Sequence, residues 1–197
     1  MLKAVIFDMD GVLVDSEPLH AKAFVMAMKQ FGVDITTEYN YRFIGSTALS
    51  MCESVIKEFH LDLSPDEILD ANDAAIRTLI KEEGYTPVPY TLNLIKELYK
   101  HGIRLAIASS SSEKQIESVT KALGIKKYFN KFISGARLEN PKPAPDIFLK
   151  ALKELGVKGS ESIVIEDSMN GSIAAKEAGI PCIGFINKNS GNQDLST

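Results

Sequence analysis

The stretch Ala4-Val5-Ile6-Phe7-Asp8-Met9-Asp10-Gly11 decides the fold prediction, because an apolar run ends abruptly in two aspartates and a glycine. Four consecutive apolar residues predict a strand that is buried on both faces, as strands of parallel sheets are. Gly11 lets the chain turn as it leaves this strand. Asp8 and Asp10 are therefore expected at the carboxyl end of a parallel strand, where open α/β sheets bind their ligands.

Asp8 and Asp10 are two residues apart, so alternation along an extended strand points both side chains to the same side. Two carboxylates this close repel each other unless a cation or a proton lies between them. The alternative interpretation is a solvated acidic loop after an edge strand. The rest of the chain decides between the two, according to whether it supplies partners for the aspartates.

The composition limits the classes of partner. With 197 residues, 45% of them hydrophobic, the chain can form one core, or one core and a small inserted domain. The net charge of −4 gives no reason to expect a nucleic-acid partner, and no apolar segment reaches the roughly 18 residues of a membrane span. The first residues run directly into the predicted strand and leave no room for a signal peptide. Cys52 and Cys182 have no metal-ligand spacing, so we expect reduced thiols in a cytoplasmic protein. The chain is expected to be a monomer.

Residues 16–87 have a helical pattern. Apolar residues recur three or four positions apart, for example at Phe24, Met28 and Phe31. The sequence Ser64-Pro65-Asp66-Glu67 is typical of a helix start, with the serine as N-cap and the proline in the first turn. No strand is predicted in this region. We expect a bundle of about four helices, inserted between the first strand and the rest of the chain.

Strands and helices alternate in the rest of the chain. The predicted strands are 103–108, 132–134, 162–165 and 181–185, and the predicted helices are 91–101, 113–123, 145–155 and 172–178. This alternation implies parallel βαβ units with right-handed crossovers. The predicted fold class is α/β: a doubly wound parallel sheet, a Rossmann-like core of residues 1–15 and 88–197, with the helical-bundle cap at 16–87. The polar tail after Phe185 is expected to be loose.

Reactive side chains follow three predicted strands and occupy one loop. They are Asp8 and Asp10, Ser109, Glu166 and Asp167, and Lys142, which stands between two prolines. Because the carboxyl ends of parallel strands lie along one edge of the sheet, we expect these groups to converge. Carboxylates from two strands suit Mg²⁺ that keeps some of its water, and a hydroxyl and a lysine suit phosphate oxygens. A carboxylate beside such a metal and a phosphoryl group can act as a nucleophile and form an acyl phosphate.

The chain resembles the haloacid dehalogenase superfamily of phosphotransferases, in the subgroup with a helical cap after the first strand. Its four motifs occur in the family's order: Asp8-Met9-Asp10-Gly11-Val12, Ser109, Lys142 and Glu166-Asp167-Ser168. Within the superfamily the chain is most similar to the β-phosphoglucomutase-like branch. It shares with that branch Asp15, His20 and the string Lys-Pro-Ala-Pro-Asp at 142–146.

The resemblance implies a role for each motif residue. Asp8 would attack phosphorus in line, and Asp10 would protonate the leaving oxygen and later activate water. Ser109 and Lys142 would hold the transferring phosphoryl group, whose charge is spread over its equatorial oxygens. Dehalogenases proper lack a carboxylate at the position of Asp10, so dehalogenation is not expected.

The resemblance also implies a Mg²⁺ site. Its ligands would be an oxygen of Asp8, the main-chain carbonyl of Asp10 and the carboxylate of Asp167. Glu166 would contribute directly or through water.

Substrate choice in this family depends on the cap, and one cap loop approaches the active site with Gly45 at its turn. In phosphoglucomutases basic residues flank this glycine and hold a second phosphate, but here Ile44 and Ala48 occupy those places. This difference counts against mutase activity. Arg42 and Arg77 are either substitutes for those cations or ordinary surface charges.

Three further residues have two interpretations each. His20 either helps to position substrate, as in the mutases, or is a partly exposed histidine near a hinge. Ser111 either binds phosphate or belongs to a helix N-terminus, with Ser111 or Ser112 as the cap. Asp15 is interpreted as a hinge or helix-start residue rather than an extra ligand.

The leading hypothesis is a Mg²⁺-dependent phosphatase of small phosphate monoesters, sugar phosphates foremost, that works through an aspartyl-phosphate on Asp8. The alternative enzyme is a β-phosphoglucomutase-type hexose-phosphate mutase. A third hypothesis is a phosphate- or metal-binding module without turnover, although every motif position is filled.

Overall fold

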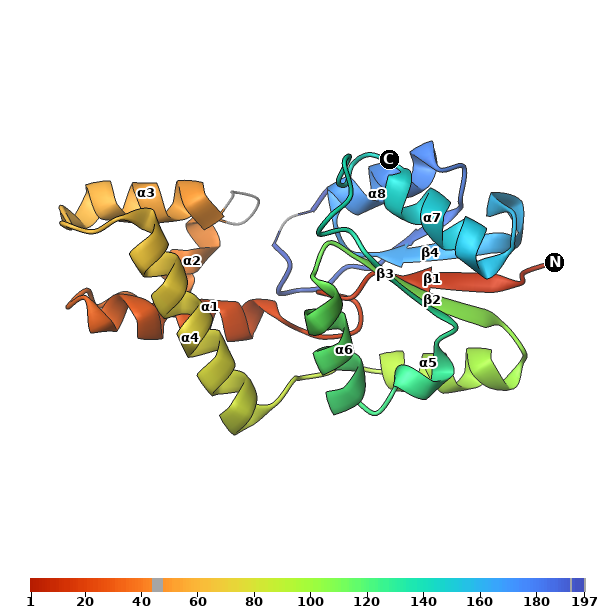
Figure 1. Ribbon diagram of the computed structural model, residues 1–197, viewed down its shortest axis with the longest axis horizontal. Coiled ribbons are helices and arrows are strands. Elements are labelled where there is room, and N and C mark those ends of the chain that lie inside the picture. Colours follow the sequence, from red (N-terminus) through yellow and green to blue (C-terminus); the bar gives the residue numbers. More distant parts are fainter. Residues whose placement is uncertain (44–47, 192, 197) are drawn as a thin grey trace. The chain divides into compact units, whose positions relative to one another are not determined.

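The computed structural model describes residues 1–43, 48–191 and 193–196 (Figure 1). The chain divides into two compact units, one formed by residues 1–15 and 85–197 and the other by residues 16–84. Residues 85–87 belong to the first unit, because Pro87 forms a β-bridge with Val14 and the Thr86 carbonyl accepts the amide of Asp15.

The first unit is built on a parallel sheet with the strand order β3-β2-β1-β4-β5. The strands are β1 (Ala4–Phe7), β2 (Arg104–Ser109), β3 (Lys131–Ser134), β4 (Ser162–Glu166) and β5 (Cys182–Gly184). The central strand is β1, and its last residue Phe7 pairs with Ile107 on one side and Ile165 on the other. Residues that follow β1, β2 and β4 therefore meet at one edge of the sheet. This confirms the predicted doubly wound α/β core.

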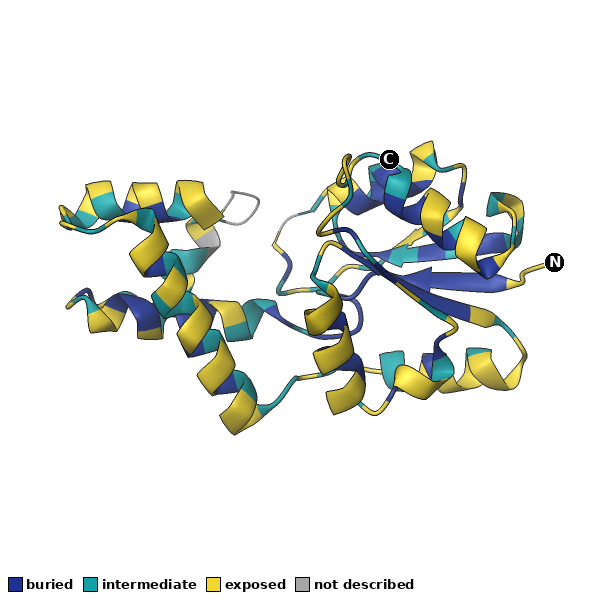
Figure 2. Ribbon diagram, in the orientation of Figure 1, coloured by how far each residue is buried: buried dark blue, intermediate teal, exposed yellow. Residues whose placement is uncertain are grey.

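Helices cover both faces of this sheet. They are α5 (Thr91–Lys100) and α6 (Glu113–Ala122) on one face, and α7 (Asp146–Leu155) and α8 (Met169–Glu177) on the other (Figure 1). Each face of the sheet has its own hydrophobic core, and alternate residues of β1 belong to each. Ala4 and Ile6 pack toward α7 and α8, whereas Val5 and Phe7 pack toward α5 and α6. All four are at most 3% exposed, which explains the uninterrupted apolar run of this strand. Figure 2 shows the same strand buried along its length.

Helix α8 begins at Met169, three residues before the predicted start at 172. Ser168 is its N-cap, and the Ser168 hydroxyl accepts a hydrogen bond of 3.0 Å from the Gly171 amide. The prediction missed this cap because Asn170 and Gly171 are poor helix formers. As a consequence, the helix starts two residues after Asp167, at the edge where the reactive residues meet.

The described part of the second unit is helical, as the apolar spacing predicts. It contains α1 (Glu17–Gln30), α2 (Thr37–Asn40), α3 (Ala48–Phe59) and α4 (Pro65–Glu83). Phe24, Met28 and Val55 are at most 1% exposed and form part of its core. The predicted N-cap Ser64 is confirmed, since it forms a reciprocal capping box with Glu67. None of the helices in the described ranges is long and apolar enough to span a membrane.

Candidate active site

Three charged side chains, Asp8, Lys142 and Glu166, are buried together at the carboxyl end of β1 and β4. They are 10%, 7% and 1% exposed, respectively. The Lys142 ammonium lies 2.5 Å from Asp8 Oδ1, 2.6 Å from Glu166 Oε1 and 3.3 Å from the carbonyl of Ala108. An ammonium has three N–H donors, so each finds one acceptor. All three N–H donors of Lys142 thus have acceptors, but the cluster has two carboxylates for one cation and so carries excess negative charge.

The pKa values of this cluster follow from burial and from the charge imbalance. Burial raises the pKa of the Asp8 carboxyl well above its usual range, and Lys142 opposes the shift while Glu166 and Asp10 add to it. Burial by itself would lower the pKa of the Lys142 ammonium, but the two carboxylates more than offset it and raise that pKa. Lys142 is therefore protonated at neutral pH. Any further positive charge near Asp8 would stabilise the ionised form of its carboxyl.

Both carboxylate oxygens of Glu166 are engaged. Oε1 accepts from Lys142, and Oε2 accepts from the amide and the hydroxyl of Ser168 at 2.7 and 2.9 Å. Gly171 makes this close packing possible, since a Cβ there would lie 1.8 Å from Glu166 Oε1. Glu166 thus connects Lys142 to the N-cap of α8 through hydrogen bonds.

Asp10 belongs to a second hydrogen-bonded group. The Ser111 hydroxyl donates to Asp10 Oδ2 at 2.8 Å, and the Ser111 amide donates to Ser109 Oγ at 3.0 Å. The Ser134 hydroxyl, on β3, donates to the Ser111 carbonyl at 2.7 Å. Ser112 rather than Ser111 is the N-cap of α6, and phosphate binding by Ser111 stays a prediction. Ser111 is instead placed to orient the second aspartate.

Asp167 packs against the chain segment that follows Asp10. Asp167 is 6% exposed, and its Oδ2 accepts a hydrogen bond of 2.5 Å from Ser190 Oγ. Gly11 has a φ of +77°, and a Cβ at this position would lie 1.9 Å from Asp167 Oδ2. Both the backbone conformation and this contact require glycine. Gly11 thereby allows the end of β4 to approach the loop after β1.

Replacing Gly11 with alanine is expected to lower the free energy of unfolding by about 2–4 kcal/mol, because backbone strain and an overpacked contact add together. The matched control is Gly102→Ala, where φ is +72° but nothing lies within 4 Å of the new Cβ. This control should cost only the backbone strain, about 1–2 kcal/mol. Urea denaturation measures both. Equal losses in the two variants would show that room for Asp167 is not what Gly11 provides.

The tail after β5 is not loose at residues 187–190, so that expectation is wrong. Asn187 Nδ2 donates to the Gly11 carbonyl at 2.9 Å and to Asp15 Oδ1 at 3.3 Å, and Asn189 Nδ2 donates to Asp15 Oδ2 at 2.7 Å. The polar composition favoured a loose tail and gave no indication of these contacts. The available signal was the close spacing of Asn187, Asn189 and Ser190, since such side chains often bond to nearby backbone.

The remaining predicted site residues lie in the second unit. His20 is an exposed residue of α1, and its role stays a prediction. Gly45 and Ile44 lie outside the described residues. Within the described ranges, no three His, Cys, Asp or Glu side chains are grouped as a metal site by themselves.

The protein is thus a doubly wound α/β protein with a buried Asp–Lys–Glu cluster at the carboxyl edge of its sheet. A family model described as "Haloacid dehalogenase-like hydrolase" matches residues 5–185. The chain therefore belongs to the haloacid dehalogenase-like hydrolases, as the motifs indicated.

Similar proteins refine this assignment. The Arabidopsis thaliana protein "SUPPRESSOR OF QUENCHING 1, chloroplastic" is 35% identical over 188 residues, which cover 92% of this chain but only 18% of that protein. The "Phosphorylated carbohydrates phosphatase" of Thermotoga maritima is 30% identical over 183 residues, or 91% of this chain and 82% of the relative. The β-phosphoglucomutase structure from Clostridium difficile has a TM-score of 0.71 at 25% identity and covers 98% of this chain and 90% of that one. The chain is a hydrolase of the β-phosphoglucomutase-like branch.

Proposed function

We propose that the chain is a Mg²⁺-dependent phosphatase of small phosphate monoesters, sugar phosphates foremost, and that Asp8 carries the phosphoryl group as an aspartyl-phosphate. The observation that carries this proposal is the Asp8 carboxylate held by Lys142 at the carboxyl edge of the sheet, with Asp10 oriented by Ser111 two residues further on. The Thermotoga maritima relative, named as a phosphatase of phosphorylated carbohydrates, supports the substrate class.

In the first step an Asp8 oxygen forms a bond to phosphorus as the ester P–O bond breaks. Asp10, in its protonated form, gives its proton to the leaving alkoxide, which departs as the alcohol. Ser111 holds Asp10 Oδ2 and so limits the rotation of the acid. In the second step Asp10 takes a proton from water, the water oxygen bonds to phosphorus, and the bond from Asp8 to phosphorus breaks. Inorganic phosphate and the free carboxylate result.

Lys142 has two functions in this scheme. Its ion pair with Asp8 fixes the carboxylate, and its charge opposes the negative charge of the incoming phosphoryl group. The 3.3 Å contact with the Ala108 carbonyl is the longest of its three hydrogen bonds. We infer that a phosphoryl oxygen replaces this acceptor, because the two carboxylates keep their shorter bonds. Ser109, buried at the end of β2, is the neighbouring hydroxyl that we assign to phosphate binding.

The donor set fits Mg²⁺. Proteins commonly hold this ion with one or two carboxylates, water and substrate phosphate oxygens, so a cluster of three acids is not required. We assign Asp8, Asp167 and the main-chain carbonyl of Asp10 as its ligands, and Gly11 provides the room in which Asp167 approaches this segment. Glu166 is proposed as the anchor of Lys142, because both of its oxygens are already engaged. When bound, Mg²⁺ supplies positive charge that neutralises the phosphoryl oxygens.

Structural similarity to a β-phosphoglucomutase keeps a hexose-phosphate mutase as the second candidate. A mutase must hold a second phosphate with cationic side chains. Arg42, one of the cations considered for this role, is bonded to Glu58 through both terminal nitrogens at 3.2 Å and stacks over the Tyr39 ring at 4.7 Å. Its charge is thus compensated within the second unit, which favours the phosphatase.

The deciding experiment incubates the purified chain with a panel of sugar phosphates and other small monoesters, with Mg²⁺ or with a chelator. Inorganic phosphate and sugar isomers are both measured. We expect phosphate release that requires Mg²⁺. Isomer conversion that depends on an added bisphosphate would show the mutase instead. Metal binding without either product would show a binding module.

A further inference from the structure

We propose that tail residues 187–190 form a clamp that sets the distance between Asp167 and the loop after β1, with Asn187 and Ser190 as positioning residues for the Mg²⁺ site. This inference rests on the proposed function, since it concerns the ligands assigned there. It adds the tail to a site that the four family motifs alone would place on β1, β2, β4 and one loop.

One side of the clamp holds the loop after β1. Asn187 donates to the carbonyl of Gly11, which directly follows the Asp10 carbonyl assigned to Mg²⁺. Asn187 and Asn189 together bind both carboxylate oxygens of Asp15, at 3.3 and 2.7 Å. The loop from Gly11 to Asp15 is therefore fixed at its beginning and at its end.

The other side of the clamp holds Asp167 at the end of β4. The Ser190 hydroxyl donates to Asp167 Oδ2, and the two residues are only 7% and 6% exposed. Ser190 Oγ also lies next to Gly11, since a Cβ on that glycine would be 2.8 Å from it. Ser190 thus lies where the two ligand-bearing segments meet.

The clamp has a defined shape of its own. The Asn189 amide donates to Asn187 Oδ1 at 2.9 Å, and the Ser190 amide donates to the Asn187 carbonyl at 3.2 Å. Gln193 continues the connection, because it donates to the Ser190 carbonyl and accepts from the Met169 amide at the start of α8. These bonds let a short polar segment hold two side chains in fixed places.

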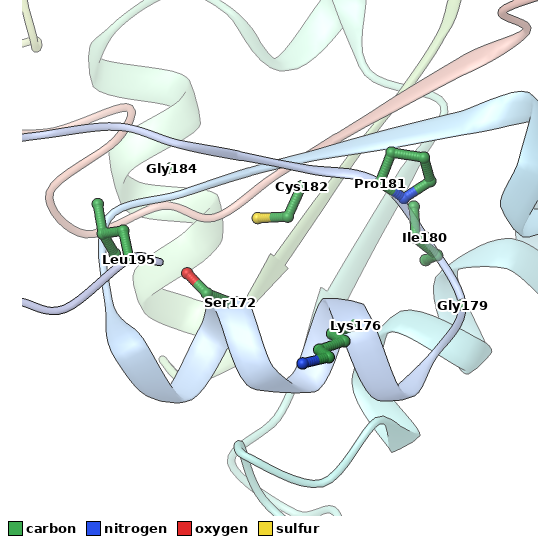
Figure 3. A pocket seen from close by; sticks show the side chains of 8 residues that line it. All are labelled: Ser172, Lys176, Gly179, Ile180, Pro181, Cys182, Gly184 and Leu195. Carbon is green, nitrogen blue, oxygen red and sulfur yellow. The ribbon is translucent and has the colours of Figure 1, made fainter. Parts of the chain in front are cut away.

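The tail is also anchored beyond the clamp. Leu195 lies over Gly184 of β5, where a Cβ on the glycine would be 2.9 Å from Leu195 Cβ. This contact borders a groove of about 430 Å³ whose lining includes Ser172 and Lys176 of α8 (Figure 3). The segment on both sides of Ser190 is therefore attached to the core.

The clamp should matter for metal affinity for a simple reason. A ligand carboxylate that is already oriented loses less freedom when the ion binds, and loss of such outer partners typically weakens metal binding about 10–100-fold. Competition between the Ser190 hydroxyl and the ion for an oxygen of Asp167 would act in the opposite direction and lower the Kd in Ser190→Ala. The sign of the effect therefore tests the inference directly.

The test is isothermal titration calorimetry of Mg²⁺ into the full chain. Ser190→Ala and Asn187→Ala are each expected to raise the Mg²⁺ Kd by about tenfold. The matched control is Ser196→Ala, in the same tail, whose hydroxyl donates to the nearby Asp194 at 2.6 Å and should leave the Kd unchanged. Thermal unfolding of each variant without metal shows whether the fold is intact. Should Ser190→Ala fail to fold, Asn187→Ala decides the same question.

The outcomes separate the two proposals. An unchanged or lower Kd in folded Ser190→Ala or Asn187→Ala would overturn the clamp, while Mg²⁺-dependent phosphate release by the unmodified chain would still stand. A raised Kd in a chain that releases no phosphate from any ester would support the clamp and overturn the phosphatase. A chain that does not bind Mg²⁺ would overturn both.

Discussion

Replacing Lys142 with methionine is expected to lower the free energy of unfolding by about 3–5 kcal/mol, the usual cost of removing one partner from a buried ion pair. The variant leaves Asp8 and Glu166 buried without a cation between them, although methionine keeps much of the lysine volume. Phosphate release should also fall below detection, because Asp8 loses the group that orients it. Urea denaturation and the phosphate assay measure the two effects.

The control for this variant is Lys150→Met, the same substitution at an exposed position of α7. Its free energy of unfolding should stay within about 0.5 kcal/mol of the original. A second comparison adds Asp8→Asn to Lys142→Met. This double variant should recover part of the lost stability, since one of the two uncompensated carboxylates is gone. Independent, additive effects would contradict the buried charge cluster as the source of the loss.

Replacing Asp8 with asparagine is expected to reduce phosphate release by roughly 10⁴-fold or more, the scale on which single catalytic side chains act in hydrolases. Asparagine has nearly the same shape but cannot form the acyl phosphate. Stability should be kept, because Lys142 and Glu166 then form a pair of one cation and one anion. The measurement is the rate at saturating Mg²⁺, alongside urea denaturation.

The exposed Asp34 provides the control for Asp8→Asn, and Asp34→Asn should leave both rate and stability unchanged. If Asp8→Asn retained activity within about tenfold of the original, a different group would have to be the nucleophile. Together with Lys142→Met, this variant separates the two contributions of the cluster. One substitution removes chemistry alone, and the other removes chemistry and stability.

The proposed phosphatase and the alternative mutase would differ in what happens to the phosphoryl group after Asp8 receives it. Hydrolysis needs water and Asp10, which Ser111 holds in place. Transfer to a second position on a sugar needs a further cationic grip, and the Arg42 charge is already paired with Glu58. We therefore expect the choice between them to depend on the second unit more than on the core cluster.

Much of the fold could be predicted from local pattern. The apolar run Ala4–Phe7 is buried on both faces because neighbouring strands and two helical layers surround it, and such burial leaves a direct trace in composition. The same holds for the capping box at Ser64, where the residues that bond are three positions apart. The start of α8 was missed because one serine cap outweighed the weak helix preference of the residues after it.

The site was predictable only as a set of residues. The spacing of Asp8, Asp10 and Gly11 and the strand ends at Ser109 and Glu166 indicated which groups would meet at the sheet edge. This spacing did not indicate which of these side chains would form hydrogen bonds or ion pairs with one another. Ser111 could have been a helix cap or a phosphate ligand, and its bond to Asp10 was not foreseen. The tail at residues 187–190 was expected to be loose, although it bonds to the loop after β1 and to Asp167.

The sequence by itself determined the parallel sheet, the helical insertion and the identity of the charged groups at the carboxyl edge, because burial and helix capping act over a few neighbouring residues. Only the tertiary structure decided that Lys142 lies between Asp8 and Glu166, 134 and 24 residues away, and that the tail clamps Gly11 and Asp167. The order of the strands in the sheet determines which of these residues come into contact. Hydrogen bonds and ion pairs at such separations depend on where the folded sheet places each side chain, and no local pattern records that position.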